Sequence, residues 1–315
     1  MSVIAVITPT WDSALWLAAM RKAAPEMEVR SWPDLGDVTQ IEFAACWLPP
    51  PKLLGTFPNL KLILALGAGV DGILHDTSLP REIPLVRAVD SDLTARMSEY
   101  VLLHVLLHHR EQRRLDTNQR LKEWDSFASP AAKDFSVGIM GLGALGLDAA
   151  QKLLMMGYKV RGWSRSAKTI AGVACFSGTD ELATFLADTD ILVCLLPSTQ
   201  QTDGILNRKL FSQLSKRGAF GAGILINAGR GRLQNEADIL SCLDDGTLHA
   251  ATLDVFAKEP LPSDSAFWLH PKVTLTPHVA ASSDPDAICR FVCNQITQFR
   301  TGKVVQHVVD RSTGY

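Results

Sequence analysis

The chain has 315 residues and a mass of 34.3 kDa, which leaves room for about two domains. Apolar residues make up 47% of the sequence and charged residues 20%, which is typical of folded globular proteins and excludes an intrinsically disordered chain. The 31 Lys and Arg residues nearly balance the 33 Asp and Glu residues, for a net charge of −2, and no basic run indicates a phosphate-binding surface. We therefore expect no nucleic acid partner.

The six cysteines are scattered, mostly among apolar neighbours, without the C-x-x-C spacing of zinc or redox sites. This pattern predicts buried thiols in a reducing compartment. The sequence begins directly with an apolar run over residues 3–7, and no apolar stretch reaches the ~18 residues that a membrane span needs. We expect a cytoplasmic protein without a membrane partner.

Short β-branched runs alternate with longer helical patterns along the chain, which predicts parallel sheets covered by helices on both faces. The first set of expected strands covers residues 3–7, 43–48, 61–66 and 83–87. The second set covers residues 136–140, 159–163, 191–196, 223–228, 249–255 and 273–276. The predicted fold class is therefore α/β, with two doubly wound parallel-sheet domains of the Rossmann and flavodoxin-like type.

A helical pattern over residues 90–124 separates the two sets of strands and predicts one long helix that joins the domains. His104 and His108 lie four residues apart on this helix, but no carboxylate is in register with them to complete a metal site. We interpret them as part of a buried or interfacial helix face and predict no metal. A last helical pattern, over residues 284–301, is expected to return to the first domain.

A glycine motif, GLGALG over residues 141–146, follows one expected strand and precedes a helical pattern that runs to about residue 156. In dinucleotide-binding folds the first glycine permits a tight turn, the second lets the backbone approach a pyrophosphate, and the third lets the helix pack on the strand. A glycine-rich turn that binds no ligand, or another nucleotide, is the alternative. The candidate cofactor-binding residues here are Gly141, Gly143, Ala144, Leu145 and Gly146.

The next strand ends in the sequence RGWSRS over residues 161–166, without the acidic residue that binds the ribose of NAD(H). Arg165, flanked by Ser164 and Ser166, can instead bind a 2′-phosphate, with Lys168 nearby. We therefore predict that NADP(H) is preferred and that NAD(H) is possible. The alternative is that Arg165 and Lys168 belong only to a solvated loop.

An arginine, a glutamate and a histidine follow three successive expected strands, at the edge where open α/β sheets bind ligands. Arg230 can bind a carboxylate through two parallel hydrogen bonds, and His278 can give or take a proton. Glu259 can hold the imidazole and favour its charged form. Alone, Arg230 would more often be a surface ion-pair partner, and only its place beside the other two indicates a role in chemistry.

Taken together, these segments resemble the D-isomer-specific 2-hydroxyacid dehydrogenases over essentially the whole chain. Within that family the sequence is similar to the glyoxylate/hydroxypyruvate reductases of the bacterial A type. Further motifs that carry the resemblance are LGAGVD at 66–71, MSEYV at 97–101, WSRS at 163–166, and LP at 196–197 with Thr202. Ser98 departs from the family, in which alanine is usual at this position.

The resemblance implies that Arg230, Glu259 and His278 are the catalytic residues. It also implies that the substrate carboxylate is bound by Arg230 and by the backbone N–H groups of Ala68 and Gly69. Trp47 corresponds to a substrate-pocket position, although an aromatic residue in a small domain is as often part of the core.

For the cofactor, the resemblance implies further contacts. Asp254 and Ala228 are expected to face the nicotinamide, and Pro197 and Thr202 to lie along the cofactor. Residues 1–101 with 282–315 are expected to form a substrate-binding lid domain, and residues 102–281 the dinucleotide-binding domain. The active site is expected in a cleft between them.

The resulting hypothesis is an NADPH-dependent reductase of small 2-keto acids such as glyoxylate and hydroxypyruvate, which forms D-2-hydroxy acids. The nicotinamide would supply a hydride and His278 a proton, while domain closure excludes water. The alternatives are a reductase of bulkier 2-keto acids and a nonenzymatic NADP(H)-sensing protein, which would need no proton donor. We expect the chain to form a homodimer.

Overall fold

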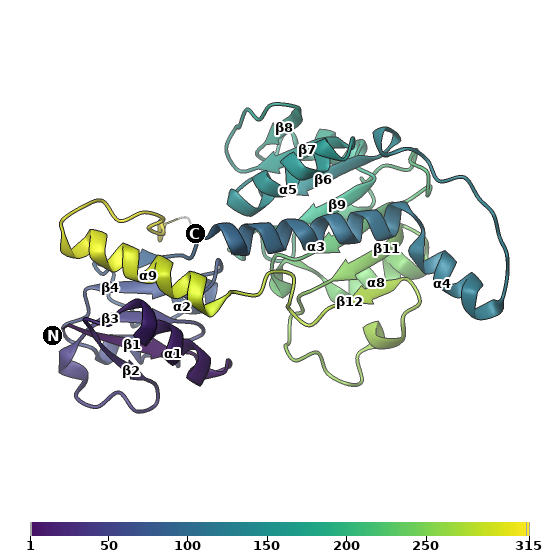
Figure 1. Ribbon diagram of the computed structural model, residues 1–315. Coiled ribbons are helices and arrows are strands. Elements are labelled where there is room, and N and C mark those ends of the chain that lie inside the picture. The colour runs from purple at the N-terminus through teal and green to yellow at the C-terminus, as the bar shows by residue number, and fades with distance from the viewer. Residues whose placement is uncertain (1, 313, 315) are drawn as a thin grey trace. The chain divides into compact units, whose positions relative to one another are not determined.

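The computed structural model describes residues 2–312 and 314, and the chain divides into two compact units (Figure 1). Unit 1 comprises Met1–Leu93 and Ser282–Tyr315, and unit 2 comprises Thr94–Ala281. The chain therefore leaves unit 1, forms unit 2 and returns to unit 1 at its end. The division expected between residues 101 and 102 stays a prediction.

Unit 1 is built on a five-stranded parallel sheet with the strand order β2-β1-β3-β4-β5. The strands are β1 (Val3–Ile7), β2 (Glu28–Ser31), β3 (Ile41–Cys46), β4 (Leu62–Ala65) and β5 (Leu85–Val86). This order is that of flavodoxin-like folds. The central strand β1 is buried at every residue, as expected for a strand covered on both faces.

Two helices, α1 (Ser13–Ala23) and α9 (Pro285–Arg300), pack together on one face of this sheet (Figure 1). The side chain of Asp284 caps α9 by accepting a hydrogen bond from the Ala287 N–H at 2.8 Å. The short helix α2 (Asp71–Leu74), the 3₁₀ turns η1 (Val38–Gln40) and η2 (Leu54–Thr56), and neighbouring loops lie around the other face.

Unit 2 is built on a seven-stranded parallel sheet with the order β12-β11-β10-β9-β6-β7-β8. Its strands are β6 (Ser136–Met140), β7 (Lys159–Ser164), β8 (Val173–Ser177), β9 (Ile191–Cys194), β10 (Gly223–Asn227), β11 (Leu248–Leu253) and β12 (Val273–Leu275). The strand order reverses between β6 and β9, as in Rossmann folds. Ligands of such folds bind where the order reverses, outside the carboxyl ends of the strands.

Alternate residues of these strands face two separate cores. Ile224 and Ile226 of β10 face helices α3 (Ser91–His109) and α5 (Ala144–Met155), whereas Leu225 faces the other side. On that side the sheet is covered by α6 (Leu182–Ala187), α7 (Arg208–Phe211) and α8 (Glu236–Asp244). The turns η3 (Ala132–Asp134), η4 (Gly231–Leu233) and η5 (Ala266–Leu269) complete the unit.

The two parallel sheets confirm the predicted α/β class with two doubly wound domains. One prediction was wrong: the expected helix over residues 90–124 is two helices, α3 and α4 (Gln112–Leu121). Glu111 interrupts the helix with a left-handed backbone, at a φ of 53°. No residue of α4 is buried, so no core extends beyond α3 to favour a continuous helix.

The edge strands β2 and β8 were not predicted. β2 has only one apolar residue, and β8 carries the apolar run Val173–Phe176 but is only partly buried at the edge of the sheet. Ser98 lies buried on α3 and donates a hydrogen bond to Asp148 of α5. It therefore links the two helices on this face of the sheet. Among the described residues, no helix combines the length and the hydropathy that crossing a bilayer requires.

Candidate active site

The candidate residues of unit 2 all follow, or end, a strand of the seven-stranded sheet at its carboxyl end. Because parallel strands share the direction of the chain, these ends lie along one edge of the sheet. The residues and the strands that carry them are Gly141 (β6), Ser164 (β7), Pro197 (β9), Ala228 (β10), Asp254 (β11) and His278 (β12).

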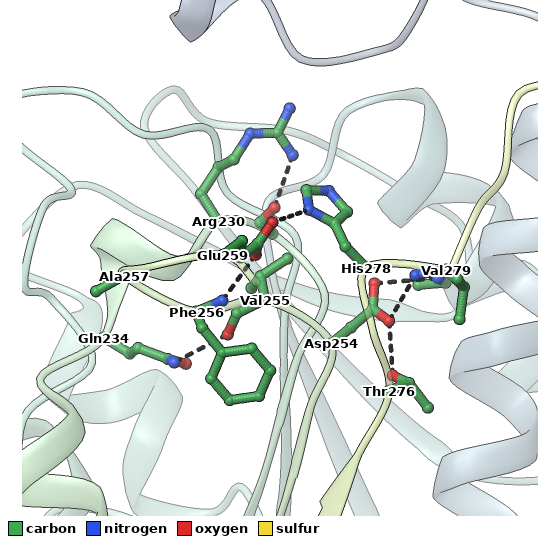
Figure 2. Close-up of polar contacts among 12 residues, drawn as sticks. Arg230, Gln234, Asp254, Val255, Phe256, Ala257, Glu259, Thr276, His278 and Val279 are labelled. Carbon is green, nitrogen blue, oxygen red and sulfur yellow. Dashed lines mark hydrogen bonds and ion pairs between the residues drawn. The ribbon is translucent and has the colours of Figure 1, made fainter. Parts of the chain in front are cut away.

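His278 and Glu259 form a hydrogen-bonded pair, with Nδ1 of His278 2.7 Å from Oε2 of Glu259 (Figure 2). The other carboxylate oxygen of Glu259 accepts a hydrogen bond from the Phe256 N–H at 2.9 Å. Burial raises the pKa of Glu259, but the hydrogen bonds from His278 and Phe256 outweigh burial and hold the pKa below its ordinary value.

The negative charge of Glu259 determines which ring nitrogen of His278 donates a hydrogen to it. A charged carboxylate can only accept, so Nδ1 must donate to it. Nε2 is then the atom of the imidazole that gives or takes a proton in a reaction. The pair is thus oriented as a general acid or base needs to be.

Arg230 lies beside this pair, on the loop that follows β10 (Figure 2). Its positive charge also lowers the pKa of Glu259, and its Nη1 donates to the Gly229 carbonyl at 2.8 Å. A Cβ added at Gly231 would overlap the carbonyl group of Phe256. The missing side chain therefore lets the Arg230 loop touch the loop that leads to Glu259.

Two buried amide side chains, which the sequence analysis did not identify, join these loops. Asn227 donates to Oε1 of Gln234 at 2.8 Å, and Gln234 donates to the Val255 carbonyl at 2.9 Å. Asn227 also accepts a hydrogen bond from the Gly229 N–H at 3.1 Å. The available signal was a polar residue, Asn227, at the end of an otherwise apolar strand.

Asp254 lies almost fully buried behind His278, with 1% of its surface exposed. Its carboxylate accepts hydrogen bonds from the Thr276 hydroxyl at 2.6 Å and from the N–H groups of Val279 and Ala280 at 2.9 and 3.0 Å (Figure 2). Ala228, which was also expected near the nicotinamide, is buried at the end of β10.

The glycine motif has the geometry that a dinucleotide requires. Gly141 has a φ of 103°, which favours glycine, and a Cβ added at Gly146 would overlap the Gly141 carbonyl oxygen. A Cβ added at Gly143 would meet no atom within 4 Å, directly before the first residue of α5, Ala144. The backbone is therefore open to a phosphate at a helix N-terminus, and these residues fit a dinucleotide cofactor.

The loop after β7 is linked to the glycine motif. Nζ of Lys168 donates to the Leu142 carbonyl at 2.6 Å, and Ser164 donates to the Ser166 carbonyl at 2.8 Å. Arg165 is exposed on the same loop. The positive charges of Arg165 and Lys168 are thus carried by one loop that is tied to the turn at residues 141–146.

The loop after β9 is held by hydrogen bonds of Thr202 to other residues of the same loop. Thr202 donates to the Pro197 carbonyl at 2.7 Å and accepts a hydrogen bond from the Thr199 N–H at 2.9 Å. These bonds give residues 197–202 a defined path at the same edge of the sheet as the glycine motif.

In unit 1, Trp47 lies against the segment that contains Ala68 and Gly69. A Cβ added at Gly67 would overlap the Trp47 ring, and the same ring stacks on Trp11 with ring centroids 5.0 Å apart. Trp47, Ala68 and Gly69 are all partly exposed. Unit 1 therefore places Trp47 against Gly67, the residue directly before Ala68 and Gly69.

The histidines of α3 are held within unit 2. Nε2 of His108 lies 2.9 Å from the Thr252 hydroxyl, and burial lowers the pKa of His108 to about 3, so the ring is neutral at physiological pH. His104 is buried against Tyr100. Within residues 2–312 and 314, no group of three or more His, Cys, Asp and Glu side chains could hold a metal ion.

The chain is similar to known proteins over nearly its whole length. Residues 102–280 match the family model described as D-isomer specific 2-hydroxyacid dehydrogenase, NAD binding domain. The glyoxylate/hydroxypyruvate reductase A of Salmonella heidelberg is 42% identical over 315 residues, and that of Yersinia enterocolitica is 39% identical over 312, with 98% of each chain covered in both cases.

Two solved structures of similar proteins contain NADP. The NADPH-dependent glyoxylate/hydroxypyruvate reductase from Sinorhizobium meliloti, in complex with NADP and sulfate, is 46% identical with a TM-score of 0.96. A probable 2-hydroxyacid dehydrogenase from Rhizobium etli, in complex with NADP, HEPES and L(+)-tartaric acid, is 43% identical with a TM-score of 0.94. Each comparison covers 100% of both chains.

The lowered pKa of Glu259 predicts a pH-dependent contribution to stability. The charged carboxylate stabilises the fold above its ordinary pKa of 4.5, and the contribution is lost as the pH falls through the lower folded-state pKa. The Glu259→Gln variant should be less stable than the wild type at neutral pH, by about 1 kcal/mol or less because solvent screens the pair, and the difference should vanish at acid pH once Glu259 is protonated in the folded state. Urea unfolding across this pH range measures the difference, and a constant difference would contradict the prediction.

Proposed function

Because this chain belongs to the D-isomer specific 2-hydroxyacid dehydrogenase family, we propose that it is an NADPH-dependent reductase of small 2-keto acids. Glyoxylate and hydroxypyruvate are the proposed substrates, in line with the names of its relatives, and D-2-hydroxy acids are the products. The observation that carries the proposal is the His278–Glu259 pair beside Arg230, at the edge of the sheet that also carries the glycine motif.

Arg230 is proposed to bind the substrate in two ways. Its guanidinium group can hold the carboxylate through two parallel hydrogen bonds and polarise the neighbouring carbonyl oxygen. The backbone N–H groups of Ala68 and Gly69 are proposed to bind the same carboxylate, and Trp47 to line the substrate pocket. These contacts would orient the carbonyl carbon for reduction.

His278 is proposed to protonate the carbonyl oxygen from Nε2 as the carbon is reduced. Glu259 accepts the Nδ1 hydrogen at 2.7 Å, which holds the ring in place and leaves Nε2 as the atom that gives up the proton. The bound nicotinamide supplies the hydride. In oxidation of a 2-hydroxy acid, the neutral imidazole would accept the proton at the same atom.

The cofactor is proposed to lie along the carboxyl edge of the unit 2 sheet. Its pyrophosphate would contact the glycine turn, with Ala144 and Leu145 at the start of α5, and the loop with Pro197 and Thr202 would lie alongside. Ala228 and Asp254 would face the nicotinamide. The 2′-phosphate would be bound by Ser164, Arg165 and Ser166, which is why we propose that NADP(H) is preferred over NAD(H).

We further propose that the protein is a homodimer. No residue of α4 is buried, and Leu121 and Trp124 at its end are 61% and 97% exposed. A second copy of the chain would cover these apolar side chains, which are costly to leave in water. Sedimentation of the wild type and of a Leu121→Glu, Trp124→Ala variant tests the proposal, because the variant should be a monomer.

The proposed location is the reducing cytoplasm. Cys46 and Cys194 lie fully buried in apolar cores, where burial raises the pKa of each thiol to about 12. These cysteines are therefore packing residues in their thiol form, as is usual for proteins of reducing compartments.

Steady-state reduction of glyoxylate, hydroxypyruvate and phenylpyruvate, each with NADPH and with NADH, tests the proposed function. We expect the highest kcat/KM for the two small acids with NADPH. Higher kcat/KM for phenylpyruvate would favour the reductase of bulkier acids. Tight NADPH binding without turnover of any 2-keto acid would favour an NADP(H)-sensing protein, although such a protein has no need of the His278–Glu259 pair.

Substitution of the proton donor should separate chemistry from cofactor binding. The His278→Ala variant should lose ~10²- to 10⁴-fold in kcat while its Kd for NADPH stays nearly unchanged. The matched control is His270→Ala, since His270 also pairs with a carboxylate of unit 2, at 3.3 Å from Asp244, but follows η5. Comparable kcat values for the two variants would refute the assignment of His278.

Arg165→Ala should weaken NADPH binding by ~10- to 100-fold and leave NADH binding nearly unchanged, because each charge-assisted contact to the 2′-phosphate is worth about 1.5–3 kcal/mol. Dissociation constants of both cofactors, measured by fluorescence titration, give the result. Arg217→Ala, which removes another exposed arginine of unit 2, should change neither constant. Equal losses for both cofactors in Arg165→Ala would contradict a 2′-phosphate role.

A further inference from the structure

His278 has an unusual backbone conformation. Its φ is 55°, in the left-handed region that residues with a side chain adopt at an energetic cost. The conformation persists only if the surrounding structure holds it. One of these restraints is the hydrogen bond from the His278 N–H to the Asp254 carbonyl, at 2.8 Å.

Asp254 holds the other side of the same turn. Its carboxylate accepts the N–H groups of Val279 at 2.9 Å and Ala280 at 3.0 Å (Figure 2). Together with the His278 N–H, one buried residue therefore binds three successive backbone N–H groups. The position of the His278 turn therefore depends on where the Asp254 carboxylate lies.

The Asp254 carboxylate is held in turn by a chain of two hydroxyl groups. Thr276 donates to Oδ1 of Asp254 at 2.6 Å, and the hydroxyl of Tyr100, on α3, lies 2.8 Å from the Thr276 oxygen. The single hydroxyl hydrogen of Thr276 is used toward Asp254, so Tyr100 must be the donor to Thr276. Tyr100 is buried, and its burial raises the pKa of the phenol, so it keeps the hydrogen that it donates.

We propose that Tyr100 and Thr276 are positioning residues of the reductase, which place the Asp254 carboxylate and through it the turn that presents His278 to the substrate. The inference rests on the proposed function. It adds that Tyr100, on helix α3 and far in sequence from Arg230, Glu259 and His278, affects the rate of the reaction. Loss of either hydroxyl should let the carboxylate move and should loosen residues 278–280.

Thr276→Val is the central test, because it replaces the hydroxyl by a methyl group of similar size. We expect kcat to fall about tenfold, the effect of losing one hydrogen bond to a charged group, while KM for glyoxylate and Kd for NADPH change less than about twofold. Thr276→Ser restores the hydroxyl and should recover most of the lost kcat. A variant damaged only in its fold would not show this division between kcat, KM and Kd.

Thr252→Val is the matched control on the neighbouring strand. Thr252 is fully buried, and its hydroxyl binds His108 rather than Asp254. This variant should lose stability in urea without losing kcat.

Tyr100→Phe should lower kcat less than Thr276→Val does, because the Tyr100 hydroxyl is one hydrogen bond further from Asp254 than the Thr276 hydroxyl. Its matched control is Tyr158→Phe, which removes a hydroxyl bound to His109 at 2.6 Å. Because Tyr100 reaches Asp254 only through the Thr276 hydroxyl, adding Tyr100→Phe to Thr276→Val should lower kcat no further.

Amide hydrogen exchange gives a readout that does not depend on activity. In Thr276→Val the N–H groups of Val279 and Ala280 should exchange faster than in Thr252→Val, while core strands exchange alike. Unchanged exchange at these amides, or equal kcat values in Thr276→Val and Thr252→Val, would overturn the inference. A wild type that reduces no 2-keto acid would instead overturn the proposed function. The exchange data would still show whether the hydroxyl groups of Tyr100 and Thr276 hold the turn at residues 278–280.

Discussion

The shared direction of the seven strands of unit 2 is the constraint on which the site depends. Parallel pairing sends every carboxyl end to one edge, so the glycine turn, Arg230, Glu259 and His278 converge there although they span more than a hundred residues of sequence. The helices that connect the strands bury both faces of the sheet, which leaves the loops at this edge as the exposed part of a rigid base. Chemistry and cofactor binding can therefore share a few loops.

Loops at such an edge still need to be held, and here buried polar groups hold them. Asn227 and Gln234 connect the Arg230 loop to the loop before Glu259, and Asp254 binds the turn of His278. A buried polar group left without a partner is costly, so each of these side chains favours one arrangement of its neighbours over all others. The site thus owes its definition to side chains that are not expected to touch the substrate.

Much of this was predictable from the sequence, for physical reasons. Fully buried strands such as β1, β6 and β10 are apolar over all or nearly all of their length, and the glycine motif combines spacing with position, so both were found. The edge strands β2 and β8 are half exposed. The left-handed break at Glu111 occurs where the core that packs against α3 ends, and the local sequence does not show where that is. The link between Tyr100 and Thr276 joins residues 176 positions apart, which only the folded chain brings together.

The contact at Gly231 has a consequence for how the protein can change. Because the Arg230 loop meets the Phe256 peptide backbone to backbone, main-chain atoms set the distance between these two loops, and a side chain at position 231 would push them apart. Trp47, Ala68 and Gly69 lie on the other unit, whose own core supports them. Under the proposed function, changes at Trp47, Ala68 or Gly69 would therefore alter which acid is accepted without altering the contact between the Arg230 loop and the loop before Glu259.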